Sequence, residues 1–543
     1  MKRKYRILSI IISAALMAGC LTACGESSTT SGGTSSDENT VTTVTGGETT
    51  VTTPDLSADV EAPDVTDAVT ISLSSETATV TGSGAEVADG VVTITAGGTY
   101  VITGTMTEGR IIVNAPKEEV TLVLQNASVT CSTGSPLYVY KSKTTTIYLP
   151  DGTASTLTDG ASYTFNDSYS SAEEDEPNAC LYSKSDLIIA GTGSLTVKAN
   201  YNNGITGKDT LLIEKATVTV TAANHGINGK DSLTVKNAAI TVTSGGDALR
   251  STNDSDSTLG CIVIADSTLN LTAGEDGIQA ETTLIISGGR LTIATGDDGI
   301  HADDTLTISG GTINITRSYE GLEGATVNIT GSNISLVASD DGINAAGGSD
   351  QSGFGGFFMD QFGGSGDYLI SISGGVINID ASGDGIDSNG DIEISGGELY
   401  ISGPTSNGDG AIDCDGSATI TGGIVVAAGS TGMAENFGNA STQGSILVNL
   451  SGSAGQTITL KDSDGNVLVS YTPTKSYGCA VISAPGIVQG GTYTITAGSA
   501  STTVTMSSLI YGSGMGGFGG GSMGGQQPPQ GGGNMGGGPG GRG

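Results

Sequence analysis

A short pattern returns along most of the chain at a nearly constant interval: an acid or amide, then glycine, then an aliphatic residue, as in the Asp-Gly-Ile triplet that begins at Asp298. With close variants included, the first positions of the pattern are Asn203, His225, Asp247, Asp276, Asp298, Glu320, Asp341, Asp384 and Asp409. The successive intervals are 22, 22, 29, 22, 22, 21, 43 and 25 residues. Insertions at 251–260 and 349–367 account for the two longest intervals. A period near 22 indicates a repeat protein in which each unit stacks on the one before it.

Within one unit, apolar residues alternate with polar ones, as at Leu306 and Ile308 and again at Ile313 and Ile315. This alternation, broken by glycines, predicts short half-buried strands. Three such strands per unit would wind a coil around stacked aliphatic side chains. The fold class expected is therefore all-β, a right-handed parallel β-helix solenoid of about 22 residues per coil. A β-propeller would need about 40 to 50 residues per blade with aromatic signatures, and leucine-rich repeats would need a consensus asparagine.

The first 23 residues have the features of an export signal. Basic residues precede an apolar run at 7–18, which is too short to span a bilayer. The run leads to Leu-Thr-Ala-Cys, ending at Cys24, which resembles a bacterial lipobox, and Cys20 ends a weaker alternative. A plain secretory signal is the other interpretation. We expect lipidation of Cys24 and an extracellular protein attached to the bacterial cell membrane through its lipid anchor only.

The remaining chain divides by composition. Residues 24–67 read as a disordered Ser/Thr-rich tether, 68–432 as the β-helix, 433–508 as a small C-terminal cap of β hairpins, and 509–543 as a Gly/Met/Pro-rich disordered tail. The insertion at 349–367 is expected to project from the solenoid, either as a flap that stacks on sugars or as a disordered loop. Its aromatic residues are Phe354, Phe357, Phe358 and Phe362.

The formal net charge of −36 argues against nucleic acid as a partner, because phosphate binding needs a basic face. It favours cations, or polymers that are reached through cations. Zinc has little support, since there are two histidines and no CxxC or HExxH motif. The five cysteines after Cys24 have no spacing typical of a disulfide framework.

Stacked coils would turn the repeated acids into columns with a spacing of ~4.8 Å. Two carboxylates at that distance repel by about 3 kcal/mol at an effective dielectric constant of 20, so they must hold protons, spread into solvent or share a cation. Calcium suits such a site because it accepts many oxygen ligands in irregular geometry. Acid-glycine pairs that simply form tight turns are the alternative. The candidate calcium ligands are Glu275, Asp276, Asp297, Asp298, Glu320, Asp340, Asp341, Asp384 and Asp387.

A basic column is expected beside the early coils, formed by Lys184, Lys208 and Lys230 with Arg250 nearby. These side chains either contact the carboxylates of acidic sugars or pair with Asp209 and Asp231 as an ordinary solvated surface. Two aromatic residues, Tyr201 and Tyr319, lie close to the repeated acids in sequence and are further candidates for sugar contact.

Several stretches resemble one family. They are AEEDEPNACLYSKSDLIIAGTGSLTV from residue 172, ASGDGIDSNGDIEISGG from 381, GPTSNGDGAIDCDG from 403 and ITLKDSDGNVLVSY from 458. Together with the repeated NGI and DGI units, they are similar to the bacterial carbohydrate-binding parallel β-helix lipoproteins, formerly a domain of unknown function. The resemblance covers about 91–505. It implies a pectate-lyase-like fold, extracellular binding of cellulose or acidic polysaccharide, and calcium on the solenoid.

The function predicted is non-catalytic, calcium-assisted binding of polysaccharide at the cell surface, with an acidic, pectin-like polymer as the expected ligand. The chain has no Trp and few aromatic residues, which disfavours strong stacking on flat neutral glucans. Two alternatives stay open: a calcium-dependent polysaccharide lyase, with Lys208, Lys230 or Arg250 as base, and a structural surface adhesin. We expect a monomer that binds polysaccharide and no nucleic acid.

Overall fold

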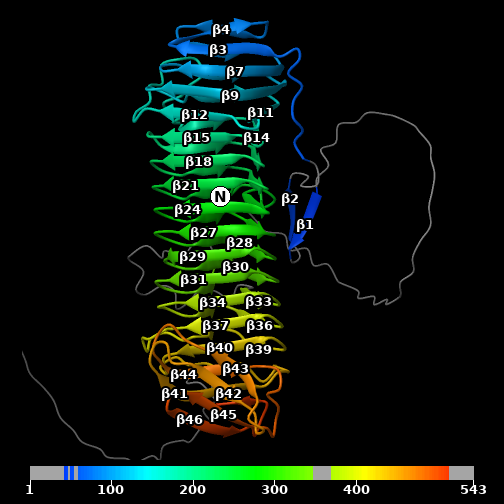
Figure 1. Ribbon diagram of the computed structural model, residues 1–543, viewed down its shortest axis with the longest axis vertical. Helices are drawn as coiled ribbons and strands as arrows, with labels where there is room; N and C mark the ends of the chain where they lie inside the picture. Colours follow the sequence, from blue (N-terminus) through cyan, green and yellow to red (C-terminus); the bar gives the residue numbers. More distant parts are fainter. Residues whose placement is uncertain (1–41, 47–48, 54–58, 347–367, 513–543) are drawn as a thin grey trace, which may run out of the picture. The chain divides into compact units, whose positions relative to one another are not determined.

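The computed structural model describes residues 42–46, 49–53, 59–346 and 368–512 (Figure 1). Within these ranges the chain is built from strands and connecting turns, and no helix there is long and apolar enough to cross a membrane. β1 (Thr42–Gly46) and β2 (Thr49–Thr53) form a two-stranded antiparallel sheet inside the predicted tether. The predicted signal, Cys24, the phenylalanine-rich insertion and the C-terminal tail lie outside the described residues.

Most of the remaining strands pair in parallel with the strands three positions before and after them in the chain. This is the connectivity of a β-helix, in which each coil contributes a first, a second and a third strand, and the strands stack in chain order in Figure 1. β28 (Ile300–Ile308) and β30 (Leu322–Ile329) each combine a first and a second strand, because no break separates the two. β9 (Glu119–Cys131) combines a second and a third strand.

The other first strands are β8 (Arg110–Asn114), β10 (Leu137–Lys141), β13 (Ala179–Ser183), β16 (Asn203–Gly207), β19 (Ile227–Gly229), β22 (Leu249–Ser251), β25 (Ile278–Ala280), β32 (Ile343–Ala345), β35 (Ile386–Ser388) and β38 (Asp413–Cys414). The other second strands are β11 (Thr144–Tyr148), β14 (Asp186–Ala190), β17 (Thr210–Glu214), β20 (Ser232–Lys236), β23 (Cys261–Ala265), β26 (Thr283–Ile286), β33 (Leu369–Ile372), β36 (Asp391–Ile394) and β39 (Ala418–Ile420).

The other third strands are β12 (Ala154–Asp159), β15 (Ser194–Ala199), β18 (Thr217–Ala222), β21 (Ala239–Ser244), β24 (Ser267–Thr272), β27 (Gly289–Ala294), β29 (Thr312–Ser318), β31 (Asn333–Ala338), β34 (Val376–Asp380), β37 (Glu398–Ser402) and β40 (Ile424–Gly429).

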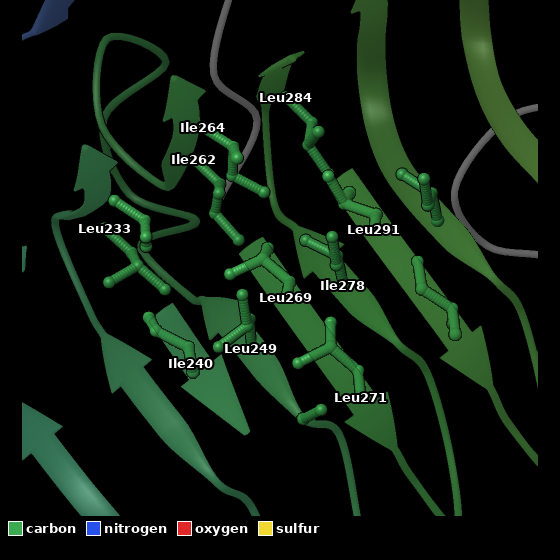
Figure 2. Close-up of a cluster of buried hydrophobic side chains, with 14 of the residues drawn as sticks. Leu233, Ile240, Leu249, Ile262, Ile264, Leu269, Leu271, Ile278, Leu284 and Leu291 are labelled. Atoms are coloured by element: carbon green, nitrogen blue, oxygen red, sulfur yellow. The ribbon is translucent and has the colours of Figure 1, made fainter. Parts of the chain in front are cut away.

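The register stacks like residues on like. Ile205 pairs with Ile227, and Ile278 pairs with Ile300, so in both cases the partner lies 22 residues further along the chain. Alternate residues point inward, and the aliphatic ones among them are almost completely buried. In Figure 2 side chains from all three strand classes of neighbouring coils converge, for example Leu233, Ile240 and Leu249. Burial of such side chains contributes roughly 1.5–3 kcal/mol each, which no single coil could gain alone.

The stack begins earlier in the chain than the visible repeat. β3 (Val69–Ser75) pairs in parallel with β7 (Gly98–Met106), which pairs with β9. Two antiparallel pairings complete this end: β3 with β4 (Thr77–Thr81), and β5 (Ala85–Ala88) with β6 (Val91–Ile94). These early coils lack the acid-Gly-Ile pattern, so the repeat alone does not reveal them.

Residues 59–68 form a segment, here called the strap, that reaches the middle of the stack. The Asp59 carboxylate lies 2.7 Å from Lys215 Nζ and 3.0 Å from Lys236 Nζ. The backbone N–H of Val60 donates to Oε2 of the buried Glu214 at 2.9 Å. Glu214 is the last residue of β17, Lys215 follows it, and Lys236 is the last residue of β20. β3, in contrast, starts the stack at Val69. The strap therefore leads from a middle coil back to the first one.

The C-terminal residues cover the last coil. β44 (Tyr477–Ser483) pairs antiparallel with β40 and with β41 (Ser445–Gly452), and β41 also pairs with β47 (Ile510–Tyr511). A separate four-stranded antiparallel sheet has the order β43 (Val467–Tyr471), β42 (Ile458–Lys461), β45 (Thr492–Ala497) and β46 (Ala500–Thr505). A second apolar cluster joins these strands. The hairpins predicted for this region are present.

Candidate functional site

The acids at the start of the first strands form a hydrogen-bonded series that we call the turn ladder. Its members are Asp247, Asp276, Asp298, Glu320, Asp341 and Asp384. Oδ1 of Asp276 accepts the backbone N–H of Asp298 at 2.9 Å, and Oδ1 of Asp298 accepts that of Glu320 at 3.2 Å. Asp247 and Asp341 bond the next coil in the same way, at 3.2 and 2.5 Å. One oxygen of most ladder carboxylates therefore bonds the following coil.

A glycine follows every ladder acid except Asp247, which Ala248 follows, and close packing rather than turn geometry requires it. A Cβ on Gly277 would lie 2.4 Å from the carbonyl oxygen of Gly299, and one on Gly299 would lie 2.5 Å from that of Gly321. Neither glycine has a positive φ. The alternative interpretation of the acid-glycine pairs, tight turns, is therefore replaced by a close approach of successive coils.

Two groups of acids come together on this ladder. Carboxylate oxygens of Asp276, Asp297 and Asp298 lie within 4.8 Å of one another, and so do those of Asp341, Asp384 and Asp387. The sequence places the members of the second group up to 46 residues apart, so the stacking of coils creates it. Both groups consist entirely of predicted calcium ligands.

Burial and mutual repulsion change the ionisation of these groups. The pKa of Asp341 is raised to about 8 by burial and by the charges of Asp387 and Asp340, and that of Asp384 to about 9 by burial and by Asp341. Burial and Asp413 raise the pKa of Asp387 to about 7. In the first group, burial and Asp298 raise the pKa of Asp276 to about 9. Burial first, and repulsion between the stacked carboxylates second, therefore favour the protonated forms of these acids.

The outward residue of each first strand forms a second series, the face column. From β16 to β38 its members are Thr206, Asn228, Arg250, Gln279, His301, Glu323, Asn344, Asp387 and Asp413. Asn344 is 7% exposed, and its amide nitrogen donates to Oε2 of Glu320 in the preceding coil at 3.0 Å. Its Oδ1 atom is buried without a hydrogen-bond partner among the described residues. The backbone of Asn344 pairs with Asp387, so this amide borders the second acid group.

These observations describe a polar face of a β-helix, and comparison with known proteins shows the family of the chain. The sequence profile of a family described as "Carbohydrate-binding domain-containing protein" matches residues 88–342 and 296–523. The chain belongs to this carbohydrate-binding family. The expected family is thereby confirmed at the level of carbohydrate binding.

One curated family member, from Acetivibrio thermocellus, has the same description and is 39% identical over 140 residues. The match covers 26% of this chain and 48% of the relative, which is about half of the relative's length. A solved structure, described as the polysaccharide lyase-like protein from C. thermocellum in a gadolinium derivative, is 30% identical. It covers 44% of this chain and 96% of the solved chain, with a TM-score of 0.43.

Both histidines of the chain lie on the polar face, and the sequence reasoning named neither as a site residue, although it gave His225 as a position of the repeat. His225 Nδ1 lies 3.1 Å from Oδ2 of Asp247, and the predicted ligand Glu275 completes a group with them instead of joining Asp276. His301 Nδ1 lies 3.6 Å from Asp298 and 3.4 Å from the buried Glu323. Both histidines occupy repeat positions, so the register could have placed them there.

The predicted basic residues have partners that differ from those expected. Lys184 and Lys208 both pair with Glu176, which belongs to the connection between β12 and β13, and not with Asp209 or Asp231. Arg250 Nη1 lies 2.6 Å from His225 Nε2 and 3.1 Å from Asp247 Oδ2. Burial acts to raise the pKa of Asp247, but the hydrogen bond of His225 and the charges of His225 and Arg250 lower it overall.

The two predicted aromatic contacts are engaged within the protein. Tyr201 stacks on Tyr163 with a centroid distance of 4.2 Å, and its hydroxyl donates to Asp175 at 2.7 Å. The pKa of Tyr319 is raised by its hydrogen bond to Asp340 and by burial, so Asp340 bonds this tyrosine beside the second acid group.

Proposed function

We propose that this protein is a non-catalytic, extracellular carbohydrate-binding protein that binds an acidic, pectin-like polysaccharide with the help of calcium. Membership of a carbohydrate-binding family supports the binding of a carbohydrate. The scaffold proposed is a right-handed β-helix of about 22 residues per coil, which agrees with the right-handed preference of parallel β connections. Anchoring to the cell membrane through Cys24 is part of the proposal, and its support is the lipobox sequence alone.

The observation that carries the proposal is the group formed by Asp341, Asp384 and Asp387 beside Asn344. It offers three carboxylates within 4.8 Å of one another and a buried amide oxygen without a partner among the described residues. An all-oxygen donor set of this kind suits a hard cation such as calcium. The pKa values raised by burial and mutual repulsion indicate a site that binds positive charge, as protons or as a cation.

The charge of the chain explains why a cation and an acidic polysaccharide belong together. A protein of net charge −36 repels a polyuronate, and the repulsion is strongest at the acidic end of the polar face. A calcium ion held by Asp341, Asp384, Asp387 and Asn344 would supply a positive charge that a sugar carboxylate can share. The ladder hydrogen bonds hold Asp341 and Asp384 in place for this task.

The test is binding of polygalacturonate, measured by calorimetry in calcium and in chelator. We expect binding in calcium, at least tenfold weaker binding in chelator, and a similar weakening in calcium after Asp384→Asn with Asp387→Asn. The control is Asp254→Asn with Asp464→Asn, which makes the same charge change at two exposed positions. Equal affinity of both variants, or binding unchanged in chelator, would contradict the calcium mechanism.

A calcium-dependent lyase is the second candidate, and one observation favours it. Arg250 pairs in register with Gln279, three residues after Asp276, so a cationic side chain lies one coil from the first acid group. A lyase would use such a base next to a cation-bound uronate. Sustained release of unsaturated product from polygalacturonate, followed by absorbance and lost in Arg250→Ala, would establish the lyase. Its absence in calcium would leave the binding function.

A further inference from the structure

The lysines of the early coils form a regular column on the polar face. The backbone N–H of Lys208 donates to Ser183 O at 2.8 Å, and that of Lys230 donates to Gly207 O at the same distance. Lys184, Lys208 and Lys230 therefore occupy equivalent positions in three successive coils, and we call them the lysine column. Successive coils are separated by ~4.8 Å, so three ammonium groups recur along this edge of the face.

A carboxylate from outside the repeat fills the first part of this column. Glu176 Oε1 lies 2.7 Å from Lys208 Nζ, and Oε2 pairs with Lys184 Nζ. The Glu176 side chain is only 7% exposed, whereas the side chains of Lys184 and Lys208 are 30% and 40% exposed. One carboxylate thus bridges the ammonium groups of two coils, which remain open to solvent on their other side.

The connection that carries Glu176, residues 160–178, is fixed on the face at several points. Ser171 and Glu176 exchange backbone hydrogen bonds at 2.7 and 2.9 Å. Asp175 accepts the Tyr201 hydroxyl, and the carbonyl of Tyr169 accepts the Tyr138 hydroxyl at 3.0 Å. The position of the Glu176 carboxylate is therefore set by contacts independent of the lysines.

The third lysine is different. Among the described residues Lys230 forms no close ion pair, and its charge acts only against the rise that burial causes in the pKa of Asp209. Beside it on the face column lie Asn228, with a buried Oδ1 lacking a hydrogen-bond partner among those residues, and Arg250, with a buried Nε in the same condition. The coil that follows the bridged pair therefore presents a cation next to unsatisfied polar atoms.

We propose that Glu176 occupies the place of a ligand carboxylate, and that the lysine column is a calcium-independent subsite for uronate polymers, blocked at Lys184 and Lys208 and open at Lys230. This inference rests on the proposed binding of acidic polysaccharide and adds a second mode of contact to it. A carboxylated sugar meets Lys230 directly, while the bridging carboxylate of Glu176 ends the subsite. Acidic sugars are thus held by cations of the protein at one end of the face and through calcium at the other.

The experiment measures binding of oligogalacturonate in chelator, because calcium-dependent binding cannot occur there. Glu176→Ala frees two lysines and opens the bridged position, so we expect affinity to rise about fivefold. Glu173→Ala, an exposed acid on the same connection, makes the same charge change and should leave affinity at the wild-type value. A neutral galacto-oligosaccharide should gain nothing in either variant. Equal affinities of the two variants for oligogalacturonate would overturn the proposal.

A second comparison does not depend on the folding of Glu176→Ala. In the otherwise unchanged protein, Lys230→Gln should abolish the binding in chelator, whereas Lys208→Gln, at a position that the Glu176 carboxylate already occupies, should preserve it. Equal losses in both variants would contradict a blocked subsite. Melting temperatures identify any variant that fails to fold. Loss of binding by wild type in calcium would instead contradict the proposed function, so the two failures are distinguishable.

Discussion

The ladder acids have two tasks because a carboxylate has two oxygens. In Asp276, Asp298 and Asp341 one oxygen bonds the backbone N–H of the next coil. This bond restrains a carboxylate that also lies close to neighbouring acids. Stability and cation binding are therefore coupled at the level of single side chains, and a substitution by Asn tests the charge while keeping an acceptor.

The first prediction concerns pH. The folded-state pKa values of Asp276, Asp341 and Asp384 are raised above the ordinary value, first by burial and then by neighbouring carboxylates, to about 9, 8 and 9. Calcium must displace these protons, so its affinity should increase steadily from pH 5 to pH 9. Calorimetric titration in two buffers of different ionisation enthalpy would count the protons released. Binding that is independent of pH would exclude these acids as ligands.

The same shifts act on stability without calcium. Groups with a raised folded pKa stabilise the fold fully only below the unfolded pKa near 4, and this contribution is lost as pH rises towards 9. Groups with a lowered pKa, such as Asp247, stabilise the fold fully above the unfolded pKa near 4 and lose this contribution as pH falls further, so they do not change stability between pH 5.5 and pH 8.5. We therefore expect a lower melting temperature in chelator at pH 8.5 than at pH 5.5, with calcium restoring more stability at the higher pH. An unchanged or higher melting temperature at pH 8.5 would contradict this.

At the scale of strands, coil stacking leaves no room for a side chain after the ladder acids that a glycine follows. Gly299→Ala would place a methyl group 2.5 Å from the Gly321 carbonyl oxygen and 2.7 Å from Ile315 Cδ1. We expect a loss of about 1–3 kcal/mol in the free energy of unfolding, seen as a lower melting temperature. Gly408→Ala is the matched control, since its Cβ would meet nothing within 4 Å. Equal melting temperatures would show that the coils can move apart.

Sequence periodicity predicts the strands well because one repeat position has one environment in every coil. Alternation at Leu306 and Ile308 predicts inward side chains, and both are fully buried. Periodicity does not predict the early coils, since the 13-residue β9 and the 160–178 connection interrupt the period. Periodicity does not predict the ion pair between Glu176 and Lys208 either, because Glu176 belongs to a connection that does not repeat and has no register.

The acid groups show the same limit at the site. Stacking brings Asp341 and Asp384 together, as their equal repeat positions indicate. The contribution of Asn344 depends on how its amide is turned, which the preceding Glu320 decides through a hydrogen bond. Periodicity therefore predicts columns, while side-chain orientation decides which members of a column act together.

For the molecule as a whole, the cap closes the open edge of the last coil. β44 pairs with β40, so its removal would expose a row of unpaired backbone groups. A chain that ends at residue 430 should form oligomers or precipitate, whereas the full chain should elute as a monomer in size-exclusion chromatography with light scattering. A folded, monomeric truncated chain would show that the last coil needs no cover.

The strap depends on one exposed acid with two lysine partners. Asp59→Ala removes both ion pairs, and we expect faster cleavage within residues 59–68 by a non-specific protease, mapped by mass spectrometry. Glu61→Ala, an exposed acid two residues away, is the control. Equal cleavage rates would mean that the bond from Val60 to Glu214 alone retains the strap.

The strap also determines where mechanical load enters the solenoid. A pull on the chain before Asp59 reaches the coils at Glu214, Lys215 and Lys236, in the middle of the stack, instead of at its first coil. The load acts first on these few bonds, and only after they break does it travel along the strap to β3. With the chain anchored through the proposed lipid at Cys24, the ion pairs of Asp59 would break before any coil unfolds. Drag on a bound polysaccharide would therefore release the strap and lengthen the connection to the membrane first.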